Sequence, residues 1–182
     1  MQISLVTSST ELQQILDLQE RNLVTNINDE EKQSQGFVTL QHTLADLQAF
    51  QEIAPSVIIK EEERVIAYAL TMPRECSEVV PALQSMFTSF DSLMWQNKPL
   101  NDYRFYVMGQ ICIDKEHRGK GLFERLYQGH RHFFGRHFDC IVTEIATRNL
   151  RSMRAHEKVG FKVIHVYRDQ QDEWAVVLWN WK

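Results

Sequence analysis

The sequence predicts an α/β (α+β) fold in a single domain, with about seven strands flanked by helices. The chain has 182 residues, of which 43% are hydrophobic and 24% charged, an ordinary composition for one globular domain. Short runs rich in Val, Ile and aromatic residues alternate with longer segments whose apolar residues recur every three or four positions. Because no internal repeat or linker interrupts this pattern, we expect one domain over residues 1–182.

The first three elements are a strand and two helices. ISLV (3–6) predicts a short strand, and the apolar residues of 9–22 have helical spacing. Ser8 and Glu11 fit a capping box at the start of that helix. After a polar, turn-rich segment, a second helix is predicted near 43–53, ending before a proline.

A hairpin and an insertion follow. VIIK (57–60) and RVIAYALTM (64–72) flank a short charged link, which predicts two antiparallel strands. The apolar residues of 78–95 recur at spacings near three and four, so we expect an inserted helix there.

The central part of the chain contains a glycine turn between a strand and a helix. YRFYVMGQICI (103–113) predicts a long strand that leads into EHRGKGLFERL (116–126). The apolar stripe that begins at Leu122 predicts a helix after the two glycines. CIVTEIA (140–146) predicts a buried strand.

The last elements are a helix and two strands. A helix is predicted from about 149 to 158, and Gly160 is suited to the positive φ of its C-terminal cap. FKVIHVYR (161–168) and WAVVLWNW (174–181) alternate in polarity and are joined by a polar turn, which predicts two final strands.

Charge is distributed unevenly along the chain. Residues 1–100 carry 6 Lys or Arg and 14 Asp or Glu, a net charge of −8, whereas residues 101–182 carry 14 and 10, a net charge of +4. A modest basic excess around one glycine turn suits a small polyanion better than nucleic acid, which usually binds a broad basic face. The sequence pI of about 6.0 also disfavours a nucleic-acid partner.

Neither a membrane location nor an oxidising one is indicated. No stretch approaches the roughly 18 consecutive apolar residues of a membrane span, and the first residues lack a secretory signal pattern. The three cysteines include no C-x-x-C pair, so we expect them to be reduced and structural. These features predict a cytoplasmic protein with no membrane partner.

The glycine turn is a candidate anion site. Gly119 and Gly121 let an anion approach the backbone amides at a helix N-terminus, and Arg118 and Lys120 add positive charge. A surface turn with solvated cations is the alternative. The nucleoside-triphosphate loop is absent, because no Ser or Thr follows Lys120, and the dinucleotide fingerprint fails at Glu124.

Residues 110–163 contain a strand, the turn R-G-K-G with its helix, a second strand, a helix that starts N-x-x-S, and a strand that starts G-F. This order resembles the GNAT superfamily of N-acetyltransferases. The family signature R/Q-x-x-G-x-G/A is met by Arg118 and Gly121, with Phe123 in place of the last small residue. The resemblance implies a GNAT-like fold with a central mixed, largely antiparallel sheet and a helical insertion near 75–102.

The resemblance also implies acetyl-CoA as co-substrate. Its pantetheine arm would lie along the strand before the glycine turn, and its pyrophosphate would rest on the amides of the turn. The implied coenzyme contacts are Ile111, Cys112, Ile113, Arg118, Gly119, Lys120, Gly121, Leu122, Phe123, Glu124, Asn149 and Ser152. Simpler roles remain open for several: strand core for the two isoleucines, packing for Phe123, and helix capping for Asn149.

Acetylation of an amine requires two proton transfers. A Lys-type amine with a pKa near 10.4 is neutral at pH 7 in about one molecule in 2,500, a cost of roughly 4.6 kcal/mol. Glu144, at the end of a strand, is our candidate base, and a surface carboxylate is the alternative. The family often has a Tyr seven residues after the Asn; here this position is His156, our candidate proton donor, and a merely packed histidine is the alternative.

The leading hypothesis is an N-acetyltransferase that moves an acetyl group from acetyl-CoA to a primary amine by direct attack in a ternary complex. The alternative is a non-catalytic acyl-CoA-binding sensor or regulatory module. The acceptor is expected to be a small molecule or a peptide, and Phe37, Trp95 and Tyr106 are candidate pocket residues. A homodimer is possible through the Trp-rich last strand, with Trp174, Trp179 and Trp181.

No metal site is expected. His130, His132 and His137 are spaced by two and five residues, which does not place all three on one helical face. We therefore expect them to be solvated histidines of the helix.

Overall fold

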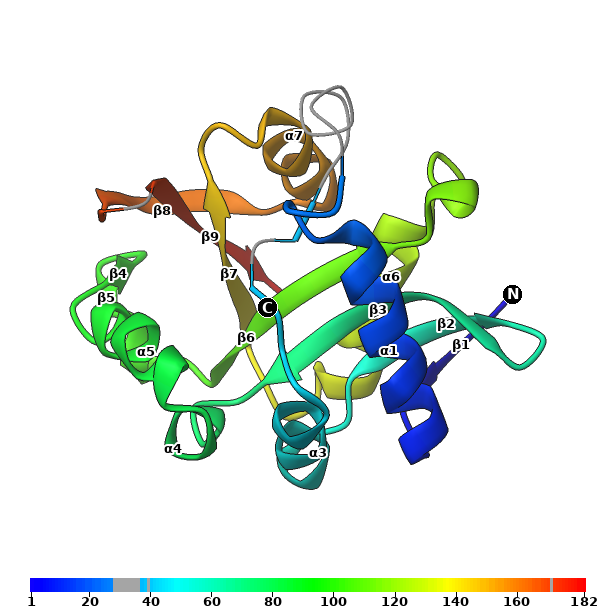
Figure 1. Cartoon of the computed structure of the whole chain (residues 1–182). Helices are drawn as coiled ribbons and strands as arrows, with labels where there is room; N and C mark the ends of the chain where they lie inside the picture. The colour runs from blue at the N-terminus through cyan, green and yellow to red at the C-terminus, as the bar shows by residue number, and fades with distance from the viewer. Residues whose placement is uncertain (28–36, 39, 171) are drawn as a thin grey trace.

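The computed structural model describes residues 1–27, 37–38, 40–170 and 172–182. A seven-stranded sheet runs through the molecule in the order β1-β2-β3-β6-β7-β9-β8 (Figure 1). Its strands are β1 (Gln2–Leu5), β2 (Val57–Glu61), β3 (Arg64–Met72), β6 (Phe105–Ile113), β7 (Cys140–Ala146), β8 (Lys162–Arg168) and β9 (Glu173–Asn180). β6 and β7 are parallel and the other neighbouring pairs are antiparallel, which confirms a mixed, largely antiparallel sheet.

Helices cover both faces of the sheet. The long helices are α1 (Ser9–Asn22), α3 (Leu44–Ile53), α6 (Leu122–Phe134) and α7 (Leu150–Val159). α1 and α3 lie on one face, and α6 and α7 lie on the other (Figure 1). The predicted capping box of α1 is confirmed, because Ser8 Oγ accepts from Glu11 N while the Glu11 carboxylate accepts from Ser8 N. Gly160 caps α7 with a φ of 116°.

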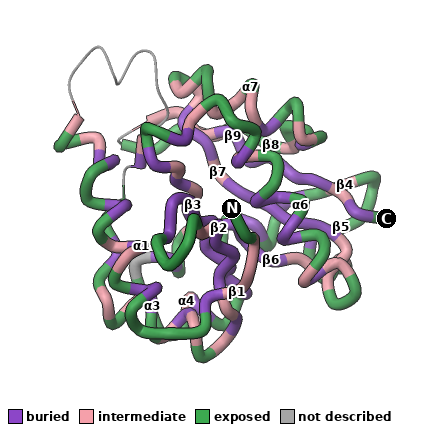
Figure 2. Tube along the Cα trace, turned by 90° about the vertical axis from the view of Figure 1, so that its right-hand side faces the viewer, coloured by how far each residue is buried: buried purple, intermediate pink, exposed green. Residues whose placement is uncertain are grey.

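Two apolar clusters fill the layers on either side of the sheet. One joins α1, α3 and the insertion to the sheet through residues such as Ile15, Phe50 and Phe90. The other joins α6 to the sheet through residues such as Leu126 and Tyr127. Figure 2 shows the buried residues concentrated in the central strands, with exposed residues along the outer sides of the helices. None of the helices in the described part of the chain has the length and hydropathy needed to cross a bilayer.

The insertion is broken into several elements, so the prediction of one continuous helix over 78–95 was wrong. It contains α4 (Cys76–Val79), η1 (Pro81–Leu83), α5 (Gln84–Phe90), β4 (Met94–Trp95), β5 (Lys98–Pro99) and η2 (Leu100–Asp102). The break falls at Val80, whose ψ of 92° is extended because it precedes Pro81. Proline disfavours the helical conformation of the residue before it, which ends α4 one turn after its start.

Burial corrects one other expectation and bears on a second. His130 is fully buried, and its Nδ1 lies 2.8 Å from the hydroxyl of Tyr106, so it is not a solvated histidine. It lies on the side of α6 that faces the sheet. Trp179 and Trp181 are each only 8% exposed and pack against one another, so most of their surface belongs to the core of this chain.

Candidate active site

The sheet opens between its two central strands. β6 and β7 pair only from Phe105–Cys140 to Val107–Val142, although β7 remains paired with β9 as far as Ala146. At the fork, Thr143 Oγ1 donates to Met108 O at 2.8 Å. Beyond this point β6 continues to Ile113 on β3 alone, so one edge of its last residues has no neighbouring strand among the described residues.

The glycine turn lies at the end of this open strand. Gly119 and Gly121 have φ values of 77° and 74°, a left-handed conformation that other residues adopt only with strain. Gly121 is the N-cap of α6 and supplies no side-chain capping bond. The first helical bond runs from Arg125 N to Gly121 O, and in the described part of the chain the backbone N–H groups from Gly119 to Glu124 have no acceptor. Six amides without an acceptor and the positive end of a helix dipole therefore lie at this turn, where Gly119, Gly121, Leu122 and Phe123 line a cavity.

Arg118 supports the turn from the side. Its Nη2 donates to Asn22 Oδ1 at the end of α1, and its Nε donates to Ile113 O at 3.4 Å. The guanidinium thus connects the end of β6, the glycine turn and α1. This geometry agrees with a role in setting the turn.

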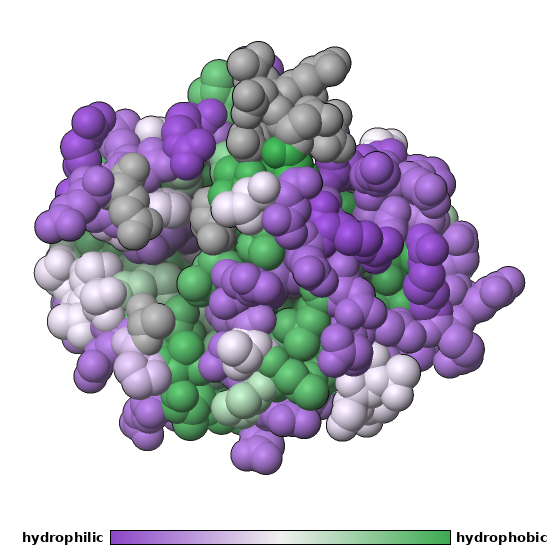
Figure 3. Space-filling model, viewed as in Figure 1, coloured by the Kyte–Doolittle hydropathy of each residue, from purple (hydrophilic) through white to green (hydrophobic). Residues whose placement is uncertain are grey.

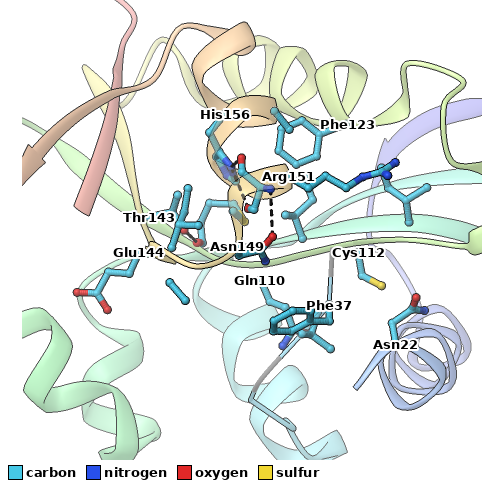
Figure 4. A pocket seen from close by; sticks show the side chains of 18 of the residues that line it. Asn22, Phe37, Gln110, Cys112, Phe123, Thr143, Glu144, Asn149, Arg151 and His156 are labelled. Carbon is cyan, nitrogen blue, oxygen red and sulfur yellow. Dashed lines mark hydrogen bonds between the residues drawn. The ribbon is translucent and has the colours of Figure 1, made fainter. Parts of the chain in front are cut away.

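A cavity of about 350 Å³ occupies the fork and reaches the turn. Figure 4 shows His156 and Phe123 on one side of it, Phe37 on the other, and Glu144 at the end away from Cys112. Of the residues predicted for coenzyme binding and catalysis, all line this cavity except Lys120 and Glu124, whose side chains are exposed. The fold therefore brings into one place residues that the sequence separates by up to 45 positions, from Ile111 to His156.

Asn149 caps α7. Its Oδ1 accepts from Ser152 N at 3.1 Å, as the capping interpretation predicted, and this bond is drawn in Figure 4. Phe123 packs edge-to-face against Tyr127 and His156, with ring centroids 5.2 and 4.9 Å apart, which confirms its packing role.

His156 is held by hydrogen bonds to both ring nitrogens. Nδ1 lies 2.8 Å from the carbonyl oxygen of Ser152, which only accepts, so Nδ1 carries the proton and Nε2 accepts from the Tyr127 hydroxyl at 2.6 Å. Burial lowers the pKa of His156 to about 4, which makes the imidazole neutral at pH 7. No ring N–H is left to point into the cavity in this arrangement.

Glu144 is in a different state. It is half-buried on β7, and its Oε1 accepts from the Tyr167 hydroxyl at 2.9 Å. Burial raises the pKa of Glu144 to about 7. The Tyr167 hydrogen bond lowers this pKa by a smaller amount, and the nearby Asp169 carboxylate raises it. A carboxylate that ionises near neutrality is suited to general-base catalysis.

The sequence did not identify several residues that complete the site. Tyr127 and Tyr167 bond the two candidate catalytic side chains, Asn22 bonds Arg118, and Leu40 and Trp174 line the cavity. Tyr127 was visible only as part of an apolar helical stripe. For Tyr167 and Trp174 the one available signal was the predicted hairpin of the last two strands, in which the structure places these residues opposite one another.

The buried histidines predict acid-sensitive stability. Burial lowers the pKa of His130 to about 3 and of His156 to about 4, so their stabilising effect is complete above pH 6.5 and lost as the pH falls toward 4. The raised pKa of Glu144 acts oppositely, with stability lost as the pH rises toward 7. Burial lowers the pKa of His42 in the same direction. The histidines therefore outnumber Glu144, and the unfolding free energy should fall between pH 6 and 5 by roughly 1.4 kcal/mol per pH unit for each net proton taken up on unfolding.

Urea unfolding at these pH values measures that slope. His130→Asn should reduce the slope by removing one of the protons that the histidines take up on unfolding, whereas His132→Asn, at an exposed histidine, is the matched control. An unchanged slope in His130→Asn would show that His130 is not buried in its neutral form.

The chain matches the model of the acetyltransferase (GNAT) family over residues 14–161. A search of curated protein sequences found no significant match.

Several solved structures have the same fold. An acetyltransferase of the GNAT family from Streptococcus agalactiae superposes with a TM-score of 0.67 at 16% identity, covering 100% of this chain and 95% of that one. yncA from Salmonella typhimurium, solved with its cofactor acetyl-CoA, gives 0.62 at 15%, covering 100% and 94%. The ribosomal-protein-alanine N-acetyltransferase from Brucella melitensis gives 0.64 at 13%, covering 99% of each chain. At these identities the likeness establishes the fold alone.

Proposed function

Because this chain belongs to the acetyltransferase (GNAT) family, we propose that it is an N-acetyltransferase that transfers an acetyl group from acetyl-CoA to a primary amine. The observation that carries the proposal is the opening between β6 and β7, which ends at six backbone amides without acceptors. A free strand edge followed by an anion-binding turn suits a ligand with an amide-bearing arm and a pyrophosphate. We take the catalytic domain to span residues 1–182, since β1 and β9 belong to the same sheet.

Each part of the site has a proposed role toward acetyl-CoA. The free edge of Ile111, Cys112 and Ile113 would pair with the pantetheine arm, and the amides of 119–124 would hold the pyrophosphate. Asn149 keeps its Nδ2 for the arm while its Oδ1 caps α7. Ser152 lies one helical turn before His156 on the same side of the cavity. The acetyl-CoA seen in yncA is in line with this choice of co-substrate.

The proposed reaction is direct attack in a ternary complex. An ammonium proton passes to Glu144, and the neutral nitrogen attacks the thioester carbon. The C–N bond forms, and the C–S bond breaks as the tetrahedral intermediate collapses. The second proton leaves the nitrogen and ends on the coenzyme thiolate, which yields an amide and a thiol. The cysteine of the cavity is unsuited to a covalent relay, because burial raises the pKa of Cys112 to about 12.

Acetyl-CoA binding and turnover test the proposal together. Isothermal titration calorimetry should show one acetyl-CoA bound per chain, and release of free thiol should follow when a primary amine is added. Binding without turnover on any amine would favour the alternative, an acyl-CoA-binding sensor. Absence of binding would reject both.

The effect of His156→Ala distinguishes proton donation from positioning. His156 could donate a proton only if one of the two hydrogen bonds of its ring opened, so we do not expect it to be the proton donor. The loss in kcat should then be only about 10-fold, caused by looser packing around the site. The pH dependence of kcat should stay unchanged, as should acetyl-CoA affinity. A loss of more than about 100-fold with a changed pH profile would instead identify His156 as the proton donor of the leaving thiolate.

A further inference from the structure

The cavity has two chemically different ends. One end contains the glycine turn and Arg118, where the proposed coenzyme phosphates lie. Glu144 lies at the other end, and Figure 4 shows Phe37 on one side of the cavity between the two ends; Leu40 and Trp174 also line the cavity. Trp174 lies opposite Tyr167, which bonds Glu144, and Leu40 lies beside Gln110 of β6. An acceptor with its amine at Glu144 shares the cavity with these side chains and with Phe37.

Gln110, a polar residue of β6 that lines the cavity, already has hydrogen-bond partners for both atoms of its amide. Gln110 is 7% exposed, and its Oε1 accepts from Gln19 Nε2 at 3.1 Å and from the hydroxyl of Tyr68. Its Nε2 donates to the carbonyl oxygen of Leu40 at 2.7 Å. Gln110 therefore anchors the segment that carries Leu40. Because both ends of its amide are engaged, it is not set up to bind an acceptor.

A second bond fixes the same segment. Gln19 Oε1 accepts from the backbone N–H of His42 at 2.9 Å, and all of these polar side chains are buried. Leu40 itself is 43% exposed, so it presents apolar surface at the mouth of the cavity. On the face that carries α1 and α3, hydrophobic residues gather in a band through the middle, between hydrophilic areas (Figure 3).

The charges around the cavity are few. Among the described lining residues, the charged ones are Arg118, Glu144 and Arg151, and Glu144 is the one carboxylate. Arg118 is bonded at the turn, and Figure 4 shows Arg151 extending toward the Phe123 side, away from Glu144.

In the described part of the chain, two charged residues near the cavity but outside its lining, Arg148 and Asp169, are already bonded. Arg148 lies 5.5 Å from the ring centre of Phe37 and forms a 2.5 Å ion pair with Asp172. Asp169 accepts hydrogen bonds from Trp174 Nε1 and Asp172 N. Among the described lining residues, a second positive charge on the acceptor would find no second carboxylate, and a negative charge would find Arg118 bonded at the turn and Arg151 extending toward the Phe123 side. Either charge would lose its water without an opposite charge of these residues directed at it.

We infer that the acceptor is a small primary amine on an uncharged, apolar body, with its nitrogen at Glu144 and its body against Phe37, Leu40 and Trp174. This inference rests on the proposed acetyl transfer. A peptide N-terminus fits less well, because its first amide would lie against the apolar side chains, the Gln110 amide is already engaged, and the free edge of β6 is assigned to the pantetheine arm. Burial of the apolar body supplies the binding free energy, and Glu144 selects the amine.

Three amines of equal chain length test this inference. Pentylamine, 1,5-diaminopentane and 5-aminopentanoate differ only in whether the far end is neutral, cationic or anionic. Thiol release should give a kcat/KM for pentylamine at least about 30-fold above either charged analogue. 2-Phenylethylamine should be as good as pentylamine or better, and the amide of Phe-Gly-Gly should be poorer than both.

A kcat/KM for the diamine, the amino acid or the peptide amide that equals or exceeds that of pentylamine would overturn the inference. So would acetyl-CoA binding without turnover of any apolar amine. If a charged amine or the peptide amide is preferred, acetyl transfer itself still stands and only the acceptor class is wrong. Absence of acetyl-CoA binding, in contrast, is a failure of the proposed function. The two failures are thus distinguishable.

A variant of the apolar wall gives an independent test. Leu40→Asp places a carboxylate at an exposed position of the wall, so it should fold and should shift the preference toward 1,5-diaminopentane by at least about 10-fold. Leu40→Asn is the matched neutral control and should show no such shift. Equal preferences in the two variants would mean that the acceptor does not contact Leu40, which would overturn the inference.

Discussion

Gly121→Glu is expected to weaken acetyl-CoA binding at least about 30-fold relative to Gly121→Gln. Both side chains must adopt the φ of 74°, at a cost of roughly 1–2 kcal/mol, so the backbone strain is matched. A Cβ added at Gly121 meets no atom within 4 Å, so both side chains have room. The glutamate alone adds a negative charge beside the proposed pyrophosphate site, and a repulsion of about 2 kcal/mol corresponds to roughly 30-fold in affinity.

Calorimetric titration with acetyl-CoA measures this difference, and thermal unfolding checks that the two variants remain equally folded. Equal affinities in the glutamate and glutamine variants would place the coenzyme phosphates elsewhere. The comparison is informative because the two variants differ by charge and hardly at all by size.

Glu144→Gln is expected to lower kcat by 100-fold to 10,000-fold, the range typical of removing a general base, without changing acetyl-CoA affinity. The wild-type rate should rise with pH up to about 7, since the pKa of Glu144 is raised to about 7 by burial and the base must be ionised. This inflection should disappear in Glu144→Gln. A variant that keeps both its rate and its inflection would rule out Glu144 as the base.

Tyr167→Phe is the matched control for that assignment. The Tyr167 hydroxyl donates to Glu144 and lowers its pKa, so its removal should move the inflection to higher pH while leaving most of the rate at pH 9. Because phenylalanine keeps the ring, the packing of β8 on β9 is retained. An inflection that stays in place would mean that another group controls the pH dependence.

The family and the coenzyme cradle were predictable because their signals are local. Gly119 and Gly121 lie two positions apart, and the capping pairs Ser8–Glu11 and Asn149–Ser152 lie three positions apart, within one helical turn. Propensity and spacing over such distances are sufficient to predict the element. The break at Val80 was equally local and was readable from Pro81.

The state of each candidate catalytic group was not predictable. His156 and Tyr127 are 29 positions apart, and Glu144 and Tyr167 are 23 apart. Whether such pairs meet depends on how α7 packs on α6 and on the register of β7, β9 and β8. His130 likewise occupied an ambiguous position on its helix until the sheet showed which side of α6 is buried.

The sequence by itself determined the order and type of the main elements, the anion-binding turn and the family, because these depend on neighbours along the chain. The tertiary structure decided where β6 and β7 separate, which tyrosines bond His156 and Glu144, and that Gln110 holds the apolar wall. These features set the protonation of the site and the surroundings of the acceptor. They depend on burial and on contacts between distant segments, which exist only once the layers have packed.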